Sequence, residues 1–261
     1  MSRELISLWT HRRALRSLVL HDLRKTYANT VGGLAWAVLT PLLPIAFFSA
    51  VFSWAVRLPL GNAPYIFGFA AAYVPWTFLA SSLNGSAGAL IEHRFLIKRV
   101  VFPIEIIPAD PPFVHALPHA ILATIVAVAC AIAGYGGASI ALLAYFFACL
   151  MLFAITTGLL LSSLVVVLRD VRHALGSVLH VWFWLTPIAW SPDRLPPLAR
   201  TVLAFNPASY IVAGYRCALM PKSFPPPTAF ETAAFWIVMT MMLAAAATCF
   251  RRLRVHFWDC V

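Results

Sequence analysis

The stretch SIALLAYFFACLMLFAITTGLLLSSLVVVL, residues 139–168, contains 30 consecutive residues without a charged side chain. An uncharged run of about 20 residues is long enough to cross the hydrocarbon core of a bilayer as an α-helix. Lipid offers no hydrogen-bond partner to an exposed peptide group, and the alternating pattern of a membrane β-barrel is absent from the chain. The run therefore predicts a membrane-spanning helix that tilts or extends beyond the bilayer.

The rest of the chain has the same apolar character. Of its 261 residues, 62% are hydrophobic and 11% are charged, less than half the charged fraction of a typical soluble domain. Such a chain cannot cover a surface that faces water, so we expect an all-α integral membrane protein with one transmembrane domain over residues 1–261. Uncharged runs predict six spans, at about residues 34–56, 65–83, 113–133, 139–168, 174–190 and 233–250.

The distribution of Lys and Arg predicts the orientation of these spans. With the N-terminus in the cytoplasm, 14 of the 19 basic residues fall in the cytoplasmic segments, which are residues 1–33, 84–107, 169–173 and 251–261. Basic residues concentrate on the cytoplasmic side of membrane proteins. Both termini are therefore predicted to be cytoplasmic, and the formal charge of +10 is a signal of topology rather than of nucleic-acid binding.

The leader, residues 1–33, has an imperfect amphipathic pattern between Leu5 and Leu23. Leu8, Leu15 and Val19 share one side of a helical wheel with Leu5 and Leu23, whereas most of the basic residues fall on the other side. This pattern favours a helix that lies in the cytoplasmic interface, and a solvated basic leader is the alternative.

The cytoplasmic segment FLIKRVVFPIEIIP, residues 95–108, interrupts two apolar runs with charges and prolines. It is too charged to enter the bilayer and too apolar to be free in water. We expect a short helix that ends near Pro103 and docks onto a partner. The alternative is a surface loop whose Lys98 and Arg99 reach lipid phosphates. Just before it, NGSAG at residues 84–88 is expected to form a flexible turn after the second span.

On the other side of the membrane, residues 191–230 contain eight prolines and the stretch NPASYIVAGYRCALM. Asn206 is a good helix N-cap and Pro207 suits the first helical turn, so a helix is expected from there to about Met220. It is too short to cross the bilayer, and a re-entrant or interfacial position before the last span is predicted. We interpret it as a closing element over a translocation path.

Aromatic residues are dense in the first and fifth predicted spans. Those near span ends fit an interfacial belt, and the deeper ones fit lipid-facing packing. As a set they could instead line a path for sugars, whose C–H faces stack on aromatic rings. The candidates for such a path are Trp36, Phe47, Phe48, Phe52, Trp182, Phe183 and Trp190.

Three intramembrane histidines offer the main alternative to transport. His115 and His119 share a helix face, with His180 elsewhere, and an i, i+4 pair suits a metal or haem. Pro118 disturbs that turn, however, and no carboxylate lies inside the predicted spans, so packing is preferred over a His-dependent enzyme or a haem-binding bundle. The cysteines lack C-x-x-C spacing, so no metal site is expected. No Walker motif occurs, so any ATP hydrolysis belongs to another chain.

Four stretches together carry a family resemblance: LRKTYANTVGGLAWAVLTPLLPIAFFSAVFS (23–53), FLIKRVVFPIEIIP (95–108), LRDVRHALGSVLHVWFWLTPIAW (168–190) and FNPASYIVAGYRCAL (205–219). In this order they resemble the ABC-2 type permeases. More narrowly, the chain is similar to the transmembrane subunit of bacterial exporters of O-antigen, teichoic acid and related lipid-linked polysaccharides. Exporters of lipids or drugs share the architecture, so another cargo stays an alternative. Ile104 and Pro111–Pro112 depart from the usual pattern.

The resemblance implies a homodimer in the bacterial inner membrane, bound to two copies of an ATPase that carries the ATP and Mg. The loop after the second span would be the coupling helix. It would dock through Phe95, Leu96, Ile97, Lys98, Arg99 and Phe102, supported by Asp170, Arg172 and His173. The first and fifth spans would border the channel. An outer gate would include Asn206, Pro207, Tyr210, Tyr215 and Arg216.

Overall fold

The computed structural model describes residues 9–27, 32–56, 60, 63–99 and 103–254. Within these ranges almost all of the chain is helical, and the strand-like pairing there is one isolated bridge between Leu60 and Ala63. The prediction of an all-α protein is confirmed for this part of the chain.

The chain folds into ten α-helices and three short helices of other types within the described ranges. In chain order these are α2 (Arg12–Tyr27), α3 (Leu34–Ala50), the π-helix η1 (Val51–Val56), α4 (Tyr65–Glu92), α5 (Arg94–Arg99), the 3-10 helix η2 (Ile104–Ala109), α6 (Asp110–Ile132), α7 (Ile140–Val167), α8 (Asp170–Leu185), the 3-10 helix η3 (Pro192–Arg194), α9 (Pro197–Ala204), α10 (Pro207–Leu219) and α11 (Ala229–Leu253).

Five described segments are long and apolar enough to cross a membrane: Ala35–Trp54, Tyr65–Leu96, Ile104–Ile132, Ile140–Val167 and Ala229–Leu253. They correspond to five of the six predicted spans. The predicted span at 174–190 falls on α8, which has 16 residues and ends at Leu185. At 1.5 Å per residue α8 is about 24 Å long, less than the ~30 Å hydrocarbon core. The count of six spans is therefore not confirmed.

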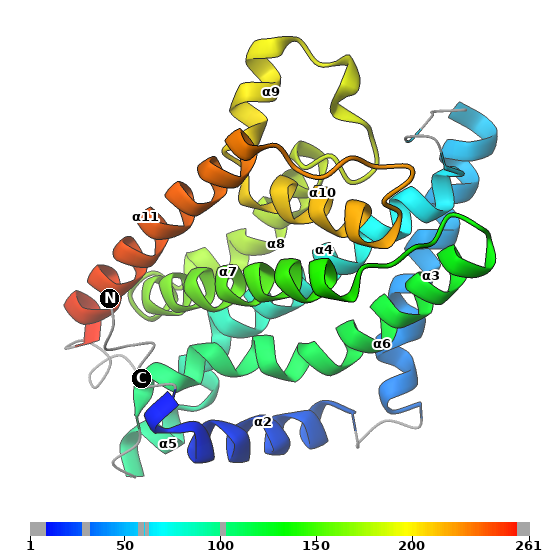
Figure 1. Ribbon diagram of the computed structural model, residues 1–261. Coiled ribbons are helices and arrows are strands. Elements are labelled where there is room, and N and C mark those ends of the chain that lie inside the picture. The colour runs from blue at the N-terminus through cyan, green and yellow to red at the C-terminus, as the bar shows by residue number, and fades with distance from the viewer. Residues whose placement is uncertain (1–8, 28–31, 57–59, 61–62, 100–102, 255–261) are drawn as a thin grey trace.

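Helix α4 is the centre of the fold. Figure 1 shows α4, α6 and α7 running alongside one another, and α4 also packs against α3, α8 and α10. Phe69, Val74 and Leu90 on α4 are completely buried. A long helix that contacts most of the others positions both ends of the bundle.

The expected flexible turn at residues 84–88 is wrong, because α4 continues through it to Glu92. The small residues of NGSAG serve close packing instead. A Cβ on Gly85 would lie 2.8 Å from Pro111 Cβ, and one on Gly88 would lie 2.9 Å from Arg172 Cζ. Ser86 donates to the Pro108 carbonyl across 2.9 Å. The sequence therefore uses small residues where neighbouring elements approach the helix.

Helix α2 confirms that a helix forms in the leader, at Arg12–Tyr27, whereas Leu5 and Leu8 lie outside the described residues. Its buried side carries Leu15 and Leu18, and it lies along α6 (Figure 1). Leu18 packs in a small core with Leu90 of α4 and Phe250 of α11. The leader helix is thus attached to the bundle near the ends of α4 and α11.

Between the fifth and last predicted spans lie two α-helices and the short η3, rather than the one helix predicted. Helix α9 begins at Pro197 within the proline-rich segment, and its start there was not anticipated. Helix α10 agrees with the prediction: Asn206 is its N-cap and accepts from the Ala208 amide, and the helix ends at Leu219. Helix α11 then starts with a capping box of Thr228 and Glu231.

Candidate functional site

The predicted coupling segment forms α5, directly after α4 (Figure 1). The described part of α5 extends to Arg99, so a short helix here is confirmed; residues 100–102 lie outside the described residues, and an end near Pro103 stays a prediction. Phe95 is 58% exposed, and Leu96 packs against the small core that contains Leu90 and Ile107. The side chains of Ile97, Lys98 and Arg99, and all of Phe102, lie outside the described residues. Helix α5 therefore presents at least one large apolar side chain outward.

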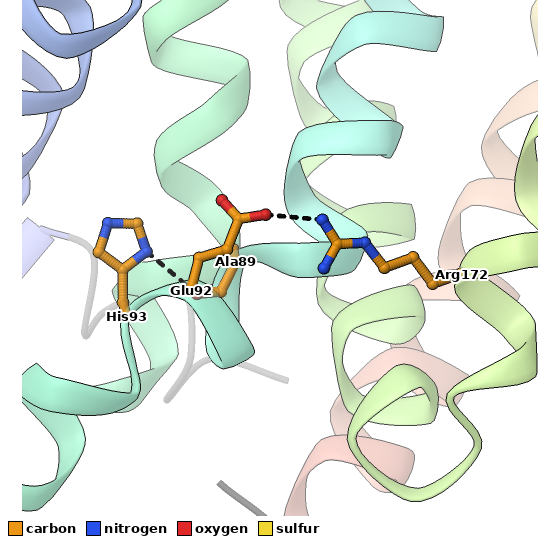
Figure 2. A network of polar contacts seen from close by, with 4 residues as sticks. All are labelled: Ala89, Glu92, His93 and Arg172. Carbon is orange, nitrogen blue, oxygen red and sulfur yellow. Dashed lines mark hydrogen bonds and ion pairs between the residues drawn. The ribbon is translucent and has the colours of Figure 1, made fainter.

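An ion pair connects this segment to the second predicted cytoplasmic loop. Figure 2 shows Arg172 Nη2 at the start of α8 donating to Glu92 Oε1 at the end of α4, across 2.7 Å. Both side chains are nearly half exposed. Asp170 and His173 are exposed beside Arg172. The structure thus brings Arg172 to the predicted coupling region, through a carboxylate that the sequence reasoning did not single out.

His93 adds a link from α4 to the leader helix. Its Nδ1 lies 3.0 Å from the Ala89 carbonyl (Figure 2), and its Nε2 lies 3.1 Å from Asp22 Oδ2 on α2. Asp22 and the buried Asp110 of α6 line one cavity of about 310 Å³ with His93. In the sequence, the adjacent Glu92 and His93 at the end of a long apolar run could have indicated this cluster.

Another ion pair reaches α11 at the same end of the bundle. Arg254 Nη1 lies 2.8 Å from Glu105 Oε1 of η2. Among the described residues, two Arg–Glu ion pairs and the His93–Asp22 contact, which is an ion pair when His93 is protonated, therefore connect α4, α8, α2, η2 and α11 around α5. We call this end, defined by Glu92, His93, Glu105, Arg172 and Arg254, the charged end.

The aromatic residues predicted for a channel pack partly on one another and on α4. The ring centroid of Phe48, on α3, lies 5.5 Å from that of Phe69 and 6.2 Å from that of Phe183. Phe52 stacks on Tyr65 at 5.4 Å. Phe183 is buried against α4. Within one subunit, Phe48, Phe52 and Phe183 join α3 to α8 through α4.

Three other members of that set face outward or are tied to the backbone. Trp36 and Phe47 are 56% and 64% exposed, and both lie on α3. Trp36 lines a cavity of about 470 Å³ with Tyr73 and Trp76 of α4. Trp190 donates its indole N–H to the Trp184 carbonyl across 2.9 Å. Of these, Trp36 and Phe47 are available to a partner or a substrate.

Trp182 links the predicted channel residues to the predicted gate. Its indole Nε1 donates to Asn206 Oδ1 across 3.0 Å, and the Asn206 amide Nδ2 donates to Thr186 Oγ1 across 3.1 Å. The same Asn206 oxygen accepts from the Ala208 amide at the start of α10. Asn206 therefore caps α10 and attaches it to the end of α8, and the next residue, Pro207, is buried.

The remaining gate candidates are buried in the bundle. Tyr210 stacks on Phe235 of α11 with centroids 4.6 Å apart, and its hydroxyl lies 3.1 Å from the Tyr145 hydroxyl of α7. The Tyr215 hydroxyl lies 2.8 Å from His119 Nε2 of α6. These contacts fix α10 to three long helices.

Arg216 makes the most buried charged contact of α10. It is 4% exposed, and its guanidinium donates to the carbonyls of Gly68, Pro187 and Ile188 at 2.9, 2.7 and 2.6 Å. Burial lowers the pKa of Arg216 to about 10, which leaves it charged at neutral pH. Within the described ranges no carboxylate lies within ion-pair distance of it. We call this end of the bundle, around α10 and the segment 186–196, the packed end.

The histidines do not form one site. His119 is buried between the rings of Phe78 and Phe147, whereas His180 is exposed on α8. His115 lines the same cavity as Trp36. In the part of the chain that the structure describes, no three His, Cys, Asp or Glu side chains could hold a metal ion together. His119 has a structural explanation, as the partner of Tyr215.

Residues 13–220 match the family model of the ABC-2 type transporters. The chain belongs to the ABC-2 type transporter family. The matched region begins in α2 and extends one residue past α10, so it includes α5, Arg172, the aromatic residues and the Asn206–Arg216 segment. As an ABC-2 permease the protein is a multi-pass membrane transport subunit.

Among curated proteins, the permease is similar to the O-antigen export system permease protein RfbA of Myxococcus xanthus. The two are 25% identical over 269 residues, covering 100% of both chains. Two Klebsiella pneumoniae proteins of the same name are 24% and 25% identical over 204 and 206 residues. These alignments cover 75% and 76% of this chain, and 75% and 77% of the relatives.

Proposed function

We propose that this ABC-2 permease is the membrane-spanning subunit of an ATP-driven exporter that moves lipid-linked polysaccharide across the bacterial cytoplasmic membrane. The observation that carries the proposal is the end-to-end similarity to a permease named for O-antigen export. Because the alignment covers all of both chains, the segments assigned here to the motor contact, the path and the gate all have counterparts in that relative.

The charged end supports the assignment of the motor contact. Phe95 is exposed on α5, and the Glu92–Arg172 pair holds the start of α8 next to the end of α4. A short helix with an exposed aromatic ring, on a base of exposed ion pairs, is suited to a cleft in a cytosolic ATPase. In this proposal two copies of that ATPase hold ATP and Mg, and both permease termini face the cytoplasm.

The permease is proposed to act as a homodimer, with the channel between the copies. Exposed apolar side chains cover α3 at Trp36, Leu43 and Phe47, and α8 at Val181 and Leu185. Such faces suit lipid or a second copy. A translocating glycan would pass along Trp36 and Phe47, and α10 with the segment before it would close the outer side.

The charge pair provides the sharpest test of the motor contact. Glu92→Arg and Arg172→Glu, each alone, are expected to reduce ATPase co-purification and surface polysaccharide, because each places two like charges together. The double variant restores the attraction and should recover both readouts. Loss of the ATPase in both single variants with unchanged surface polysaccharide would retain the coupling role and reject the polysaccharide cargo. If neither single variant changes either readout, the charged end is not the motor contact.

A second pair of variants tests the coupling segment directly. Lys98→Glu with Arg99→Glu should abolish co-purification of the ATPase while membrane insertion stays normal. The matched control is Lys222→Glu, an exposed basic residue of the packed end, which should leave the complex intact. Normal complex formation by the Lys98 and Arg99 variant would refute the assignment of α5.

A further inference from the structure

A cavity of about 570 Å³ lies at the packed end, between α9, α10 and the start of α11. In Figure 1 this is the upper part of the molecule, far from α5. Its walls include Pro187 and Asp193 after α8, Arg200 on α9, Arg216 on α10, and the proline-rich residues before Glu231. The cavity belongs neither to the motor contact nor to the aromatic path.

Two cations and two carboxylates line the cavity without pairing directly. Arg216 donates to three backbone carbonyls, and Arg200 donates to the Leu195 carbonyl across 3.0 Å and also to the backbone carbonyl of Asp193. Asp193 accepts from the Ser191 hydroxyl, and Glu231 accepts from Thr228 in the helix cap. Within the described ranges none of the four is in an ion pair with another. A ligand with one positive and one negative group is therefore complementary to this cavity.

A nearby anion stabilises the positive charge of a buried guanidinium group. A guanidinium carries five N–H donors, and the bonds from Arg216 involve each of its three nitrogens once. Donors therefore remain on a side chain that is 4% exposed, lines the cavity and has its Cζ atom 5.4 Å from the centroid of the Phe224 ring. A phosphate is well suited to guanidinium groups, which bind it by two parallel hydrogen bonds.

Apolar side chains are exposed next to the cavity. Helix α9, whose Arg200 and Thr201 line the cavity, exposes Leu198 and Val202 by 78% and 65%, and Phe205 directly after α9 is 47% exposed. The Phe205 ring lies 6.0 Å from Phe230 on α11. Phe230 begins a face of α11 that continues through the exposed Ile237 and Met241. A spanning helix exposes such a face to acyl chains, so these side chains lie where lipid is available.

The first turns of α11 place the cavity at the level of lipid headgroups. Its 25 residues extend about 37 Å, several ångströms more than the ~30 Å hydrocarbon core. The charged residues of α11 are Glu231 in its first turn and Arg251 and Arg252 in its last, so we expect both terminal turns to reach the headgroup regions when α11 crosses the bilayer. The polar walls of the cavity then suit the headgroup of a phospholipid, and the exposed apolar side chains next to the cavity suit its acyl chains.

We propose that this cavity binds the headgroup of a phospholipid that carries both a phosphate and a primary ammonium group. The phosphate lies toward Arg200 and Arg216, the ammonium lies toward Asp193 and Glu231, and the acyl chains follow Leu198, Val202, Phe205 and the exposed face of α11. The proposal needs only a membrane-embedded permease and does not depend on the exported cargo.

The chemistry discriminates among common lipids. A glycerol headgroup supplies the phosphate and leaves the two carboxylates without a cation. A choline headgroup supplies a cation that has no N–H to donate to a carboxylate. An ethanolamine headgroup satisfies both sides with charge-assisted hydrogen bonds. Phosphatidylethanolamine is therefore the expected ligand among these three.

The experiment is native mass spectrometry of the purified full-length permease in detergent. The protein is loaded with equimolar phosphatidylethanolamine, phosphatidylglycerol and phosphatidylcholine of identical acyl chains. Retention of the ethanolamine lipid is expected to exceed that of each other lipid by at least about threefold. Equal retention of all three would refute a headgroup-specific site, and an excess of phosphatidylglycerol would refute the role of the carboxylates.

Filling the cavity tests its location. Ala213 lines the cavity beside Arg216, and Ala213→Phe should reduce retention of the ethanolamine lipid about tenfold by occupying its space. Ala138→Phe is the matched control, because Ala138 is exposed in the loop before α7 and does not line the cavity. Equal retention by both variants would place the lipid elsewhere on the protein.

Charge variants separate the two halves of the headgroup and do not alter the buried Arg216. Arg200→Gln should reduce retention of the ethanolamine and glycerol lipids alike. Asp193→Asn with Glu231→Gln should remove the preference between them, and the amide oxygen of the introduced glutamine can still accept in the helix cap. Displacement of the lipid by a fragment of the exported polysaccharide would assign the cavity to cargo and overturn the proposal.

Discussion

Two Arg–Glu ion pairs and the His93–Asp22 contact, all with exposed or partly exposed side chains, connect the described helices at the charged end, whereas one buried helix connects them at the packed end. At the charged end, the side chains of the Arg172–Glu92 pair are nearly half exposed, and exposed pairs contribute about 0–1 kcal/mol. At the packed end, α10 has Tyr210, Tyr215 and Arg216 bonded to three other elements in the core. We therefore expect the packed end to contribute more to the stability of the fold than the charged end.

The largest expected effect is the loss of Arg216. Arg216→Met removes the donors to three buried carbonyls and should lower the free energy of unfolding by roughly 3 kcal/mol or more. Denaturant unfolding of the purified protein measures it. Arg200→Met, an exposed arginine of the same end, is the control and should cost less than about 1 kcal/mol. Equal costs would mean that the buried contacts of Arg216 add nothing.

The next effect concerns the close approach of α10 and α7 at Gly214. A Cβ at this position would lie 2.2 Å from the Phe146 ring, so Gly214→Ala should cost about 1–3 kcal/mol of stability. Adding Phe146→Leu should recover part of that loss. On α8, no side chain or neighbouring element among the described residues lies within 4 Å of the position that a Cβ on Gly176 would occupy, so Gly176→Ala should be neutral or stabilising in the same unfolding measurement.

A smaller effect is expected at the start of α11. Thr228→Ala removes the acceptor for the Glu231 amide and one side of the capping box, at a cost of about 1 kcal/mol. Thr240→Ala, which loses a hydroxyl bonded within the helix to the Trp236 carbonyl, should cost less. A thermal melt of each variant compares them. A larger cost at Thr240 would contradict the importance of the cap.

The smallest effect on stability is expected at the charged end. A double-mutant cycle of Glu92→Gln and Arg172→Met should give a coupling energy of about 0.2–1 kcal/mol in unfolding experiments. Export by the same variants should fall by a larger factor than that energy explains, if the pair holds the motor contact. A coupling energy of several kcal/mol would contradict the expectation that the charged end contributes less to stability than the packed end.

The sequence predicts the long helices well, because an uncharged run is a direct consequence of the lipid environment. The runs at 34–56 and 139–168 agree closely with α3 plus η1 and with α7. The run at 65–83 ends too early, because Asn84 and the glycines after it were interpreted as a turn. Asn84 instead donates to the Ala80 carbonyl, and the glycines allow Pro111 and Arg172 to approach.

The contacts between helices could not be predicted from the sequence. Arg172 was expected near the coupling segment, yet its partner Glu92 was missed, since pairing across 80 positions leaves no local pattern. Arg216 was expected in an outer gate, and its guanidinium is buried and donates to three backbone carbonyls. Every residue has a backbone carbonyl, so the sequence does not show which carbonyls accept hydrogen bonds from an arginine. A buried arginine with such partners therefore looks the same in the sequence as an exposed one.

The bonds of α10 also have a consequence for biosynthesis. Arg216 binds the carbonyls of Gly68, Pro187 and Ile188, and Tyr215 binds His119, so each of these partners precedes α10 in the chain. A ribosome makes a chain from its N-terminus, so all of these acceptors exist before the guanidinium emerges. The hydrogen-bond acceptors of Arg216 are therefore already synthesised when α10 is inserted. We expect α10 to pack last against α4, α6 and α8.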